Sequence, residues 1–409
     1  MVKVNASSSR IEGCVQLSAS KSISNRLLMI KSISKSSFDL YNLSESDDTQ
    51  ILNQILSNTS LSNEINCHHA GTTLRFLTAY LSTIKGKYRV FGSKRMHQRP
   101  IKPLVDCIRE LGIEVRYLEN EGFPPIEING NETVEGGELT ISGNISSQFI
   151  SALLLIAPKL KNGLSLRIIE PILSTPYIKM TLSLMQEMGI EYKWDKNTIH
   201  VKHQAYSTRN IAAENDWSSA SFIYSIASLS NESKIEIPHL HPNSVQGDSF
   251  VSELYSQLGV ETSFHEKGIT IIKNNHLSKK VEFNLSDFPD LALPYVVSCA
   301  GLGVEVYLTG LESLKIKESD RLVTIKKELS KFNVECKIND HSIYVPNNQQ
   351  IKYNGEVIED HNDHRIPMSI APLAIKTEGN IFFKDSSVVN KSYPLFWDDL
   401  KKLGFSIVN

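Results

Sequence analysis

Basic residues stand at the beginning of apolar runs at several places in this chain. Lys21 and Arg26 flank the start of one run, while Arg75 and Arg365 lie near the start of two others. Ser, Thr or Asp residues accompany them, and these side chains commonly cap helix N-termini. A helix N-terminus presents free N–H groups and the positive end of the helix dipole, so it binds anions. A fold that gathers several such ends would therefore bind a small molecule with several negative charges.

Six segments of the chain share this pattern of a short polar start followed by an apolar helical run. From the second segment onward, their starts recur roughly every 70–75 residues, and such a period indicates a repeated supersecondary unit. The segments are residues 22–34, 71–82, 146–157, 217–228, 289–300 and 363–374.

A second repeated element follows five of these runs. It is an amphipathic helix, then a glycine (or Asn333) that ends the helix in a left-handed conformation, then an alternating strand. Each unit therefore predicts a strand, a capped helix, a strand, a second helix and one or two further strands, which is an α/β fold. These second elements are residues 104–118, 180–194, 250–264, 322–338 and 396–408.

Composition limits the class of protein. A chain of 409 residues is too long for one ordinary core, so we expect two domains. The formal net charge is only −2, which argues against a nucleic-acid or membrane partner. The N-terminal segment has no apolar core of a secretory signal. The five cysteines lack CxxC spacing and indicate reduced thiols. We therefore expect a cytoplasmic protein.

Ten short motifs stand in the order and spacing of one known family, and they cover essentially the whole chain. Through them the chain resembles EPSP synthase, which is 3-phosphoshikimate 1-carboxyvinyltransferase. The resemblance implies transfer of enolpyruvyl from phosphoenolpyruvate to the 5-hydroxyl of shikimate 3-phosphate, inhibition by glyphosate, and action as a monomer without a cofactor. The motifs are SASKSISNR (18–26), AGTTLR (70–75), RMHQRP (95–100), ISSQF (145–149), STPYIKMTL (174–182), SVQGD (244–248), FPD (288–290), KIKESDR (315–321), NDHR (362–365) and NKSYP (390–394).

The resemblance also implies an architecture that agrees with the repeat count. Two inside-out α/β domains are expected, each made of three βαβαββ repeats, with the active site in the cleft between the domains. The pattern is interrupted near 214–217. We therefore expect one domain made of residues 1–18 and 216–409, and a second made of residues 19–215.

The family match assigns ligand contacts residue by residue. Both substrates carry a phosphate and a carboxylate, for which Lys and Arg side chains are suited. With no ligand bound, we expect the gathered cations to repel one another. The phosphoenolpyruvate contacts are expected at Lys21, Gly71, Arg99, Gln148, Arg321, Arg365 and Lys391. The shikimate 3-phosphate contacts are expected at Lys21, Ser22, Arg26, Ser146, Ser147, Gln148, Ser174, Asp290, Ser313 and Lys317.

Two carboxylates and one lysine are expected to move protons. The reaction needs a proton delivered to the methylene carbon of phosphoenolpyruvate and another removed from the 5-hydroxyl, so it needs acid and base groups with different pKa values. By the family match Asp290 is the proton acceptor, and Glu318 with Lys21 handles the other proton. The hydroxyl adds directly, so no covalent enzyme intermediate is required.

The sequence departs from the family pattern at three places. His69 and Phe76 stand where Asn and Pro are common, and both flank the turn at Gly71. Residues 313–315 are Ser-Leu-Lys where Asn-Trp-Arg is common, so a hydroxyl replaces an amide in one contact to shikimate 3-phosphate. We expect these changes to alter substrate affinity and the response to glyphosate.

Two alternatives remain open. The sister enzyme that acts on UDP-N-acetylglucosamine shares the fold but typically has a Cys in the loop that is here 92–100, and this loop has none. A non-catalytic anion-binding protein would keep the cations but would not need Asp290 or Glu318. His361-x-x-His364 has no third ligand at a convincing spacing, so no metal is expected.

Overall fold

The computed structural model describes residues 1–6, 8–35, 37–58, 61–385 and 387–408. The chain divides into two compact units. One is made of Met1–Ser18 and Glu214–Asn409, and we call it the discontinuous unit. The other is made of Ala19–Ala213, and we call it the inserted unit because it lies in the chain between two parts of the first.

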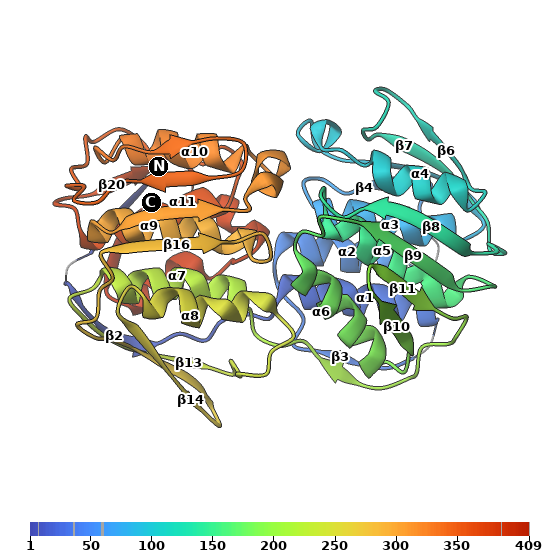
Figure 1. Cartoon of the computed structure of the whole chain (residues 1–409), viewed down its shortest axis with the longest axis horizontal. Helices are drawn as coiled ribbons and strands as arrows, with labels where there is room; N and C mark the ends of the chain where they lie inside the picture. The colour runs from blue at the N-terminus through green and yellow to red at the C-terminus, as the bar shows by residue number, and fades with distance from the viewer. Residues whose placement is uncertain (7, 36, 59–60, 386, 409) are drawn as a thin grey trace. The chain divides into compact units, whose positions relative to one another are not determined.

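The inserted unit contains six of the described α-helices and ten of the strands (Figure 1). Its helices are α1 (Lys21–Ser34), α2 (Asp47–Ser57), α3 (Gly71–Ser82), α4 (Lys102–Glu110), α5 (Ser147–Ile156) and α6 (Thr175–Glu187), with 3₁₀ helices η1 (Met96–Gln98) and η2 (Ala157–Lys159). Its strands are β3 (Leu40–Tyr41), β4 (Glu64–Asn66), β5 (Gly86–Phe91), β6 (Glu114–Tyr117), β7 (Ile126–Gly130), β8 (Gly137–Ser142), β9 (Leu164–Ile169), β10 (Tyr192–Asp195), β11 (Thr198–Val201) and β12 (Ile211–Ala212).

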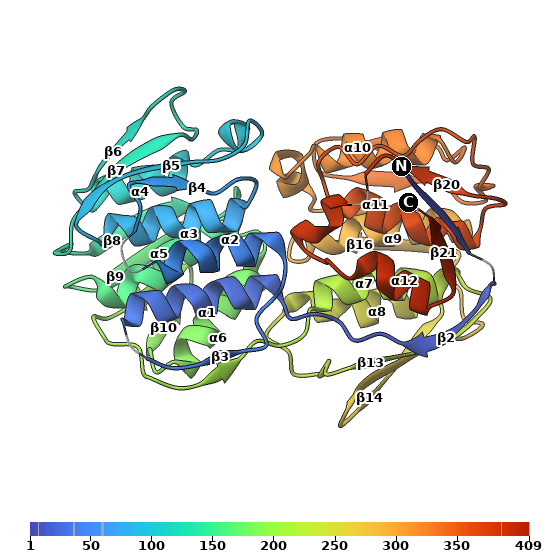
Figure 2. The same cartoon turned by 180° about the vertical axis from the view of Figure 1, so that it is seen from behind.

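The discontinuous unit has the same kinds of element (Figure 2). Its helices are α7 (Trp217–Leu229), α8 (Val251–Ser256), α9 (Ala292–Leu302), α10 (Arg321–Ser330), α11 (Arg365–Ile370) and α12 (Phe396–Lys402), with η3 (Gly247–Phe250), η4 (Pro289–Leu291), η5 (Glu312–Ile316), η6 (Ala371–Ile375) and η7 (Ser387–Lys391). Its strands are β1 (Val2–Ala6), β2 (Arg10–Cys14), β13 (Glu232–Pro238), β14 (Val260–His265), β15 (Gly268–Lys273), β16 (Lys280–Asn284), β17 (Glu305–Thr309), β18 (Lys337–Ile338), β19 (Ile343–Val345), β20 (Ile381–Phe383) and β21 (Phe405–Val408).

Four sheets have the strand pattern of a βαβαββ repeat. In each sheet the first two strands in sequence pair in parallel, and the last strand lies between the second and the third. The sheets are β4-β5-β7-β6, β8-β9-β11-β10, β2-β13-β15-β14 and β16-β17-β19-β18. The repeat predicted from the periodic segments is therefore confirmed in these four places.

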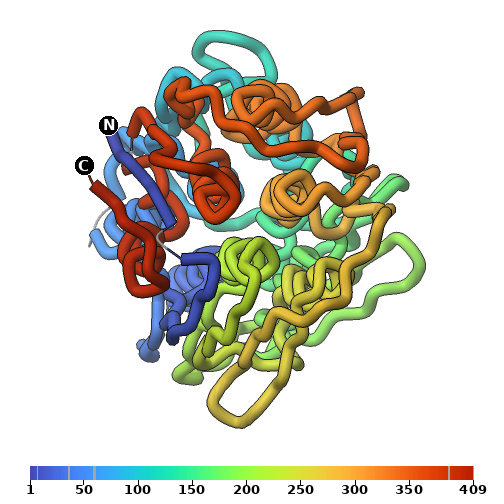
Figure 3. The backbone as a smooth tube through the Cα atoms, turned by 90° about the vertical axis from the view of Figure 1, so that its left-hand side faces the viewer, coloured from blue at the N-terminus to red at the C-terminus, as the bar shows by residue number. Residues whose placement is uncertain are grey.

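The other two repeats are incomplete and borrow a strand from elsewhere in the chain. β20 forms a parallel bridge with Ile358, and β1 lies antiparallel between β20 and β21. The N-terminal strand thus takes the place of a last strand that would follow β21, as the adjacent chain ends show (Figure 3). In the inserted unit, β12 pairs in parallel with β3, and this two-stranded sheet has no further strands among the described residues.

The most apolar helices lie inside each unit, and the sheets cover them. Nearly every residue of α3 and α5 is buried in the inserted unit, and the same holds for α7 and α9 in the discontinuous unit. A helix that is apolar on all sides must be surrounded by protein. This arrangement is the inside-out α/β fold that the resemblance implied.

The capping prediction is confirmed only in part. Ser146 caps α5 and Asp216 caps α7 through side-chain hydrogen bonds. Asp363 Oδ1 accepts a hydrogen bond from the N–H of Arg365, the first residue of α11, at 3.1 Å. The residues before α1, α3 and α9 form no side-chain cap bond in the described structure, so the prediction was wrong there. The first N–H groups of those helices have no side-chain cap, and such groups suit an anionic ligand.

Candidate active site

The candidate residues of the inserted unit lie at helix starts that contact one another. Lys21 is the first residue of α1, and its Nζ lies 3.1 Å from Asp48 Oδ2 at the start of α2. The hydroxyl of Thr73, in the first turn of α3, donates to the Asp48 carbonyl at 3.1 Å. Gln148, at the start of α5, donates from Nε2 to the Thr72 hydroxyl at 3.0 Å. The N-termini of these four helices therefore meet at one end of the unit.

Two arginines lie against Gly71. A Cβ atom at this position would be 2.6 Å from Arg99 Nη1 and 2.7 Å from Arg75 Nη1. Arg75 donates to the Gly71 carbonyl at 2.9 Å, and Arg99 is buried after η1. Glycine lets both guanidinium groups approach the start of α3 closely. The sequence places Arg75 near the start of this apolar run, but the family resemblance assigns it no contact with a substrate.

Arg26 is buried one turn into α1 and connects three helices. It donates to the Thr181 hydroxyl at 2.7 Å, to the Ser151 hydroxyl at 3.2 Å and to the Ser22 carbonyl at 2.9 Å. A further bond goes to the Tyr177 carbonyl at 3.2 Å. Burial lowers the pKa of Arg26 to about 10. Every hydrogen-bond partner that the described structure gives it is a neutral oxygen, so this buried cation is available to stabilise a nearby anion.

The departure at Phe76 has a structural explanation. Phe76 is fully buried in α3, and the Arg26 guanidinium carbon lies 5.5 Å from its ring centroid. This distance is within the range of a cation–π interaction. The ring therefore supports Arg26. His69 lies with Nε2 at 3.8 Å from Asp47 Oδ2, at the start of α2.

The four candidate serines of this unit also stand at helix starts, and Ser22 is the second residue of α1. Ser146 accepts a hydrogen bond from the Gln148 N–H at 3.3 Å, and Ser147 begins α5. Ser174 precedes α6 with φ of 56°, a left-handed conformation that is unusual for serine. We call Lys21, Ser22, Arg26, Gly71, Arg99, Ser146, Ser147, Gln148 and Ser174 the first cluster.

The second cluster lies in the discontinuous unit and is built around Arg321. Its guanidinium is almost fully buried and contacts three carboxylates, at 2.8 Å to Asp363 Oδ2, 2.8 Å to Asp290 Oδ1 and 3.0 Å to Glu318 Oε2. Burial alone would lower the pKa of Arg321, but the three carboxylates outweigh it and raise that pKa. The second cluster is made of Asp290, Ser313, Lys317, Glu318, Arg321, Asp363, Arg365 and Lys391.

Asp290 lies among three cations. Besides Arg321, Arg365 Nη2 is 3.2 Å from Asp290 Oδ2 and Lys317 Nζ is 3.7 Å from Oδ1. Arg365 also donates to the Asp290 carbonyl at 3.0 Å. Burial alone would raise the pKa of Asp290, but Arg365, Lys317 and Arg321 together hold it well below its usual range. In the ligand-free protein Asp290 is therefore ionised and strongly paired.

Lys391 and Ser313 complete the second cluster. Lys391 Nζ lies 3.6 Å from Glu318 Oε1, and Ser313 is buried in η5. Each of the four cations here has a carboxylate within 4 Å. Protein carboxylates therefore already neutralise most of the charge of these four cations. The expected repulsion between the cations of the first and second clusters stays a prediction.

Sequence reasoning missed two residues that hold the site together. Asp48 contacts Lys21, and Asp363 contacts Arg321 while its Oδ1 accepts from the Arg365 N–H at 3.1 Å. Both aspartates are buried. Asp363 lies in the NDHR motif, and Asp48 is the second residue of α2, two positions after Ser46. A search for acidic residues near helix starts would therefore have found both.

Asp248 is a buried carboxyl outside the two clusters. It lies in η3 and accepts a hydrogen bond from the Ser218 hydroxyl. Burial, with a smaller contribution from Asp290, raises its pKa to about 6, while Ser218 and Arg365 act in the opposite direction. The folded protein thus binds this proton more tightly than the unfolded chain does, since the ordinary value is 3.8. Stability from this group is present at low pH and is lost as pH rises through about 6.

We therefore expect Asp248→Asn to raise the melting temperature of the discontinuous unit at pH 7.5 and to have less effect at pH 5. The gain is bounded by about 3 kcal/mol, the equivalent of a shift of roughly two pKa units. Calorimetry of both proteins at the two pH values tests this. Glu266→Gln, which neutralises an exposed carboxylate of the same unit, is the control. A gain that is equal at both pH values would contradict the assignment.

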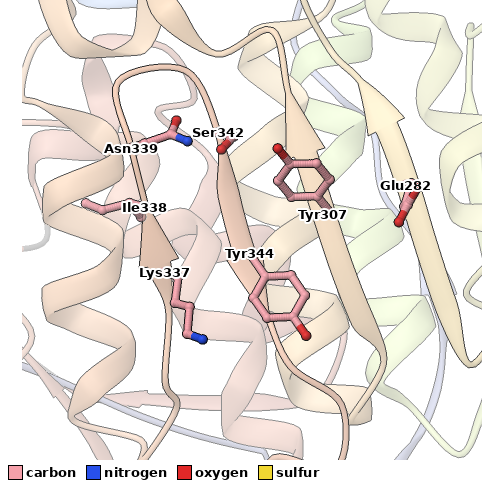
Figure 4. Close-up of a pocket in the computed structure, with 7 residues that line it drawn as sticks. All are labelled: Glu282, Tyr307, Lys337, Ile338, Asn339, Ser342 and Tyr344. Atoms are coloured by element: carbon pink, nitrogen blue, oxygen red, sulfur yellow. The ribbon is translucent and has the colours of Figure 1, made fainter.

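Three cavities have no residue of either cluster in their lining. One of about 430 Å³ is lined by side chains on the sheet β16-β17-β19-β18, among them Tyr307, Tyr344 and Lys337 (Figure 4). None of its lining residues belongs to a candidate position. Among the described residues there is no group of three or more His, Cys, Asp and Glu side chains placed to hold a metal ion. None of the described helices is both long and apolar enough to cross a bilayer.

Comparisons with known proteins agree on one family. The family model for EPSP synthase (3-phosphoshikimate 1-carboxyvinyltransferase) matches residues 56–400. A 3-phosphoshikimate 1-carboxyvinyltransferase of Bacteroides fragilis (strain YCH46) is 45% identical over 401 residues, which cover 98% of this chain and 97% of the relative. One from Histophilus somni (strain 2336) is 30% identical, with 97% of each chain covered.

Solved structures show the same fold. An EPSP synthase from Acinetobacter baumannii superposes with a TM-score of 0.80 at 19% identity, covering 100% of this chain and 99% of the other. The enolpyruvyl transferase NikO from Streptomyces tendae superposes with a TM-score of 0.77 at 14% identity, covering 100% of this chain and 98% of the other.

Proposed function

This chain belongs to the EPSP synthase family, and on that premise we propose how its two clusters share the reaction. The protein transfers the enolpyruvyl group of phosphoenolpyruvate to the 5-hydroxyl of shikimate 3-phosphate and releases phosphate, a step of the shikimate pathway to aromatic amino acids. The observation that carries the proposal is the set of cations at the helix starts of each unit, together with two carboxylates held among the cations of the second cluster.

Arg321 and Arg365 are proposed to bind the carboxylate of phosphoenolpyruvate. Both are buried, and planar guanidinium groups suit a carboxylate, whereas lysines suit a phosphate. Lys21, Arg99 and Lys391 are proposed to bind its phosphate, with Gln148 and the N–H of Gly71. The two substrates together bring about six negative charges. Several cations must therefore take part in binding.

The shikimate 3-phosphate contacts are proposed mainly in the first cluster. Ser22, Ser146, Ser147 and Ser174 stand at helix starts, where hydroxyl and N–H groups bind a phosphate together. Arg26 is the buried cation beside them. From the second cluster we add Lys317, Asp290 and Ser313.

Asp290 is the proposed proton acceptor from the 5-hydroxyl. Paired with Arg321 and Arg365, it is a poor base in the ligand-free protein, because its pKa is held low. A substrate carboxylate that binds these arginines neutralises part of their positive charge. The pKa of Asp290 then rises towards the range in which it accepts a proton.

Glu318 and Lys21 are the proposed partners for the proton at the methylene carbon. In the addition step one of them delivers a proton to that carbon while the hydroxyl oxygen bonds to the neighbouring carbon. In the elimination step phosphate leaves and the methyl group returns a proton. No bond to the enzyme forms in either step.

Phosphate release with shikimate 3-phosphate and phosphoenolpyruvate tests the reaction. The same assay with UDP-N-acetylglucosamine as acceptor tests the sister activity. That activity is disfavoured because Cys107 is buried in α4, where burial raises the pKa of its thiol to about 12. Ligand binding without phosphate release would indicate the non-catalytic alternative.

Gly71→Ala is expected to raise the KM of phosphoenolpyruvate by about 5- to 150-fold, because overpacking costs roughly 1–3 kcal/mol. The added methyl group would push Arg99 and Arg75 away from the start of α3. Glyphosate is longer than phosphoenolpyruvate, so its inhibition constant should rise more. Steady-state kinetics with both compounds measure this. Gly13→Ala in β2, which has no positive φ and where the added atom meets mainly the end of the Leu403 side chain at 3.0 Å, controls for loss of glycine. Equal losses for inhibitor and substrate would contradict the size argument.

Domain organisation, location and oligomeric state remain proposals. We propose that the inserted and discontinuous units each act as one domain. We propose further that the enzyme works in the cytoplasm as a monomer with its thiols reduced. Size-exclusion chromatography with light scattering tests whether the enzyme is a monomer.

A further inference from the structure

A group of polar and charged side chains surrounds a buried carboxylate, Glu328, seven residues along α10 from Arg321. Glu328 is fully buried near the end of this helix, on the same face as Arg321. Its carboxylate accepts hydrogen bonds from Lys331 Nζ at 2.7 Å and His361 Nε2 at 2.8 Å. It also accepts from the Glu359 N–H at 3.2 Å. These contacts have no part in the two clusters described above.

The group fastens residues 357–361 to α10 at both ends. Lys331 donates a second bond to the Val357 carbonyl at 2.7 Å, while Glu328 holds Glu359 and His361. Buried charged hydrogen bonds are among the stronger contacts in a protein, and losing one partner leaves the other unsatisfied. We call Glu328, Lys331 and His361 the fastening group.

The fastened residues lead directly into the second cluster. Asp360 accepts bonds from the Asn362 and Asp363 N–H groups at 2.6 and 2.9 Å. His361 and Asn362 both have positive φ angles, of 53° and 56°. Two consecutive residues in this conformation persist only where the surroundings hold them. Asp363 and Arg365 follow at once, so their positions depend on this turn.

We propose that the fastening group is a set of positioning residues for phosphoenolpyruvate. It fixes the turn at 360–363 against α10, and thereby sets Asp363 and Arg365 against Arg321 at the helix start. The effect acts through Arg365 and Arg321, so the inference rests on the proposed function, in which these two arginines bind the substrate carboxylate. Shikimate 3-phosphate, which is assigned mainly to the first cluster, is affected less.

The test compares His361→Leu with His361→Gln. The leucine removes the donor to Glu328, whereas glutamine keeps an N–H donor. We expect His361→Leu to raise the KM of phosphoenolpyruvate by about fivefold or more. The KM of shikimate 3-phosphate should stay within about twofold and kcat within about threefold, and His361→Gln should recover most of the loss. Lys384→Met is the matched control, because the Lys384 side chain contacts the same segment through an exposed ion pair with Glu359 at 2.8 Å.

A purely structural role would look different. The proposal is wrong if both KM values rise together, if neither changes, or if leucine and glutamine behave alike. If His361→Leu does not fold, His361→Asn removes the same contact with a residue type that tolerates positive φ. Wild-type protein that releases no phosphate would refute the proposed function itself. Unchanged KM of phosphoenolpyruvate in Arg365→Met would refute the role of Arg365, and the positioning proposal with it, while leaving the reaction intact.

Discussion

Asp290→Asn is expected to lower kcat by at least about 10²-fold, the usual contribution of one acid or base group. Asparagine has nearly the shape of aspartate but cannot accept the proton of the 5-hydroxyl. It also frees Arg321 and Arg365 from a paired carboxylate, so the KM of phosphoenolpyruvate should not rise by more than about threefold. Steady-state kinetics separate the two effects.

Glu318→Gln should give a comparable loss of kcat, because glutamine cannot transfer the proton at the methylene carbon of phosphoenolpyruvate. Glu312→Gln is the control, because Glu312 is an exposed carboxylate in η5, six residues before Glu318. Near wild-type kcat in both Asp290→Asn and Glu318→Gln would show that the acid and base lie elsewhere. A large rise in KM with unchanged kcat would make Asp290 a binding residue only.

Arg321→Met is expected to lower kcat/KM for phosphoenolpyruvate by about 10³-fold and to lower the melting temperature. Removing one partner from a buried ion pair costs about 3–5 kcal/mol, and here Asp363 would be left fully buried without its main cation. Arg321→Lys keeps the charge but not the planar fork, so it should recover only part of the loss. Kinetics and calorimetry on the same preparations measure both effects.

Lys326→Met removes an exposed cation from the same helix. It should leave kcat/KM for phosphoenolpyruvate within about twofold and the melting temperature nearly unchanged, because exposed charges contribute little. If Arg321→Met raised only the KM of shikimate 3-phosphate, the assignment of the carboxylate contact would have to be exchanged between the two substrates.

Local sequence patterns were sufficient to predict most of the helices and strands. The αL residues that end the second helices (Gly112, Gly189, Gly259, Gly404 and Asn333) all have positive φ, as predicted. The helix α2 was missed, although Ser46 precedes it and two aspartates open it. The borrowed strands could not be predicted, because β1 and β12 pair with strands that are far away in sequence and no periodic signal links them.

The candidate site was predictable in its residue types but not in its internal pairing. Helix starts and the cations Lys21, Arg26, Arg75 and Arg365 can be read from the spacing. The other cations of the site were assigned through the family resemblance. The contacts of Arg321 with Asp290, Glu318 and Asp363 join three separate segments, and only the folded chain shows that the carboxylates neutralise the cations. For the same reason, the packing of Phe76 beneath Arg26 could not be foreseen from a departure in sequence.

The borrowed strand β1 has a consequence for synthesis. The ribosome makes β1 before the inserted unit, yet its partners β20 and β21 emerge only after the whole inserted unit has been made. The residues of the inserted unit are all available much earlier, so this unit can fold while the rest is still being made. During that interval β1 and β2 are strand-forming segments without their partners, which leaves them open to wrong pairing. Removal of β20 and β21 should therefore leave β1 without its partners. Limited proteolysis should then cleave the chain near β1, far in sequence from the truncation.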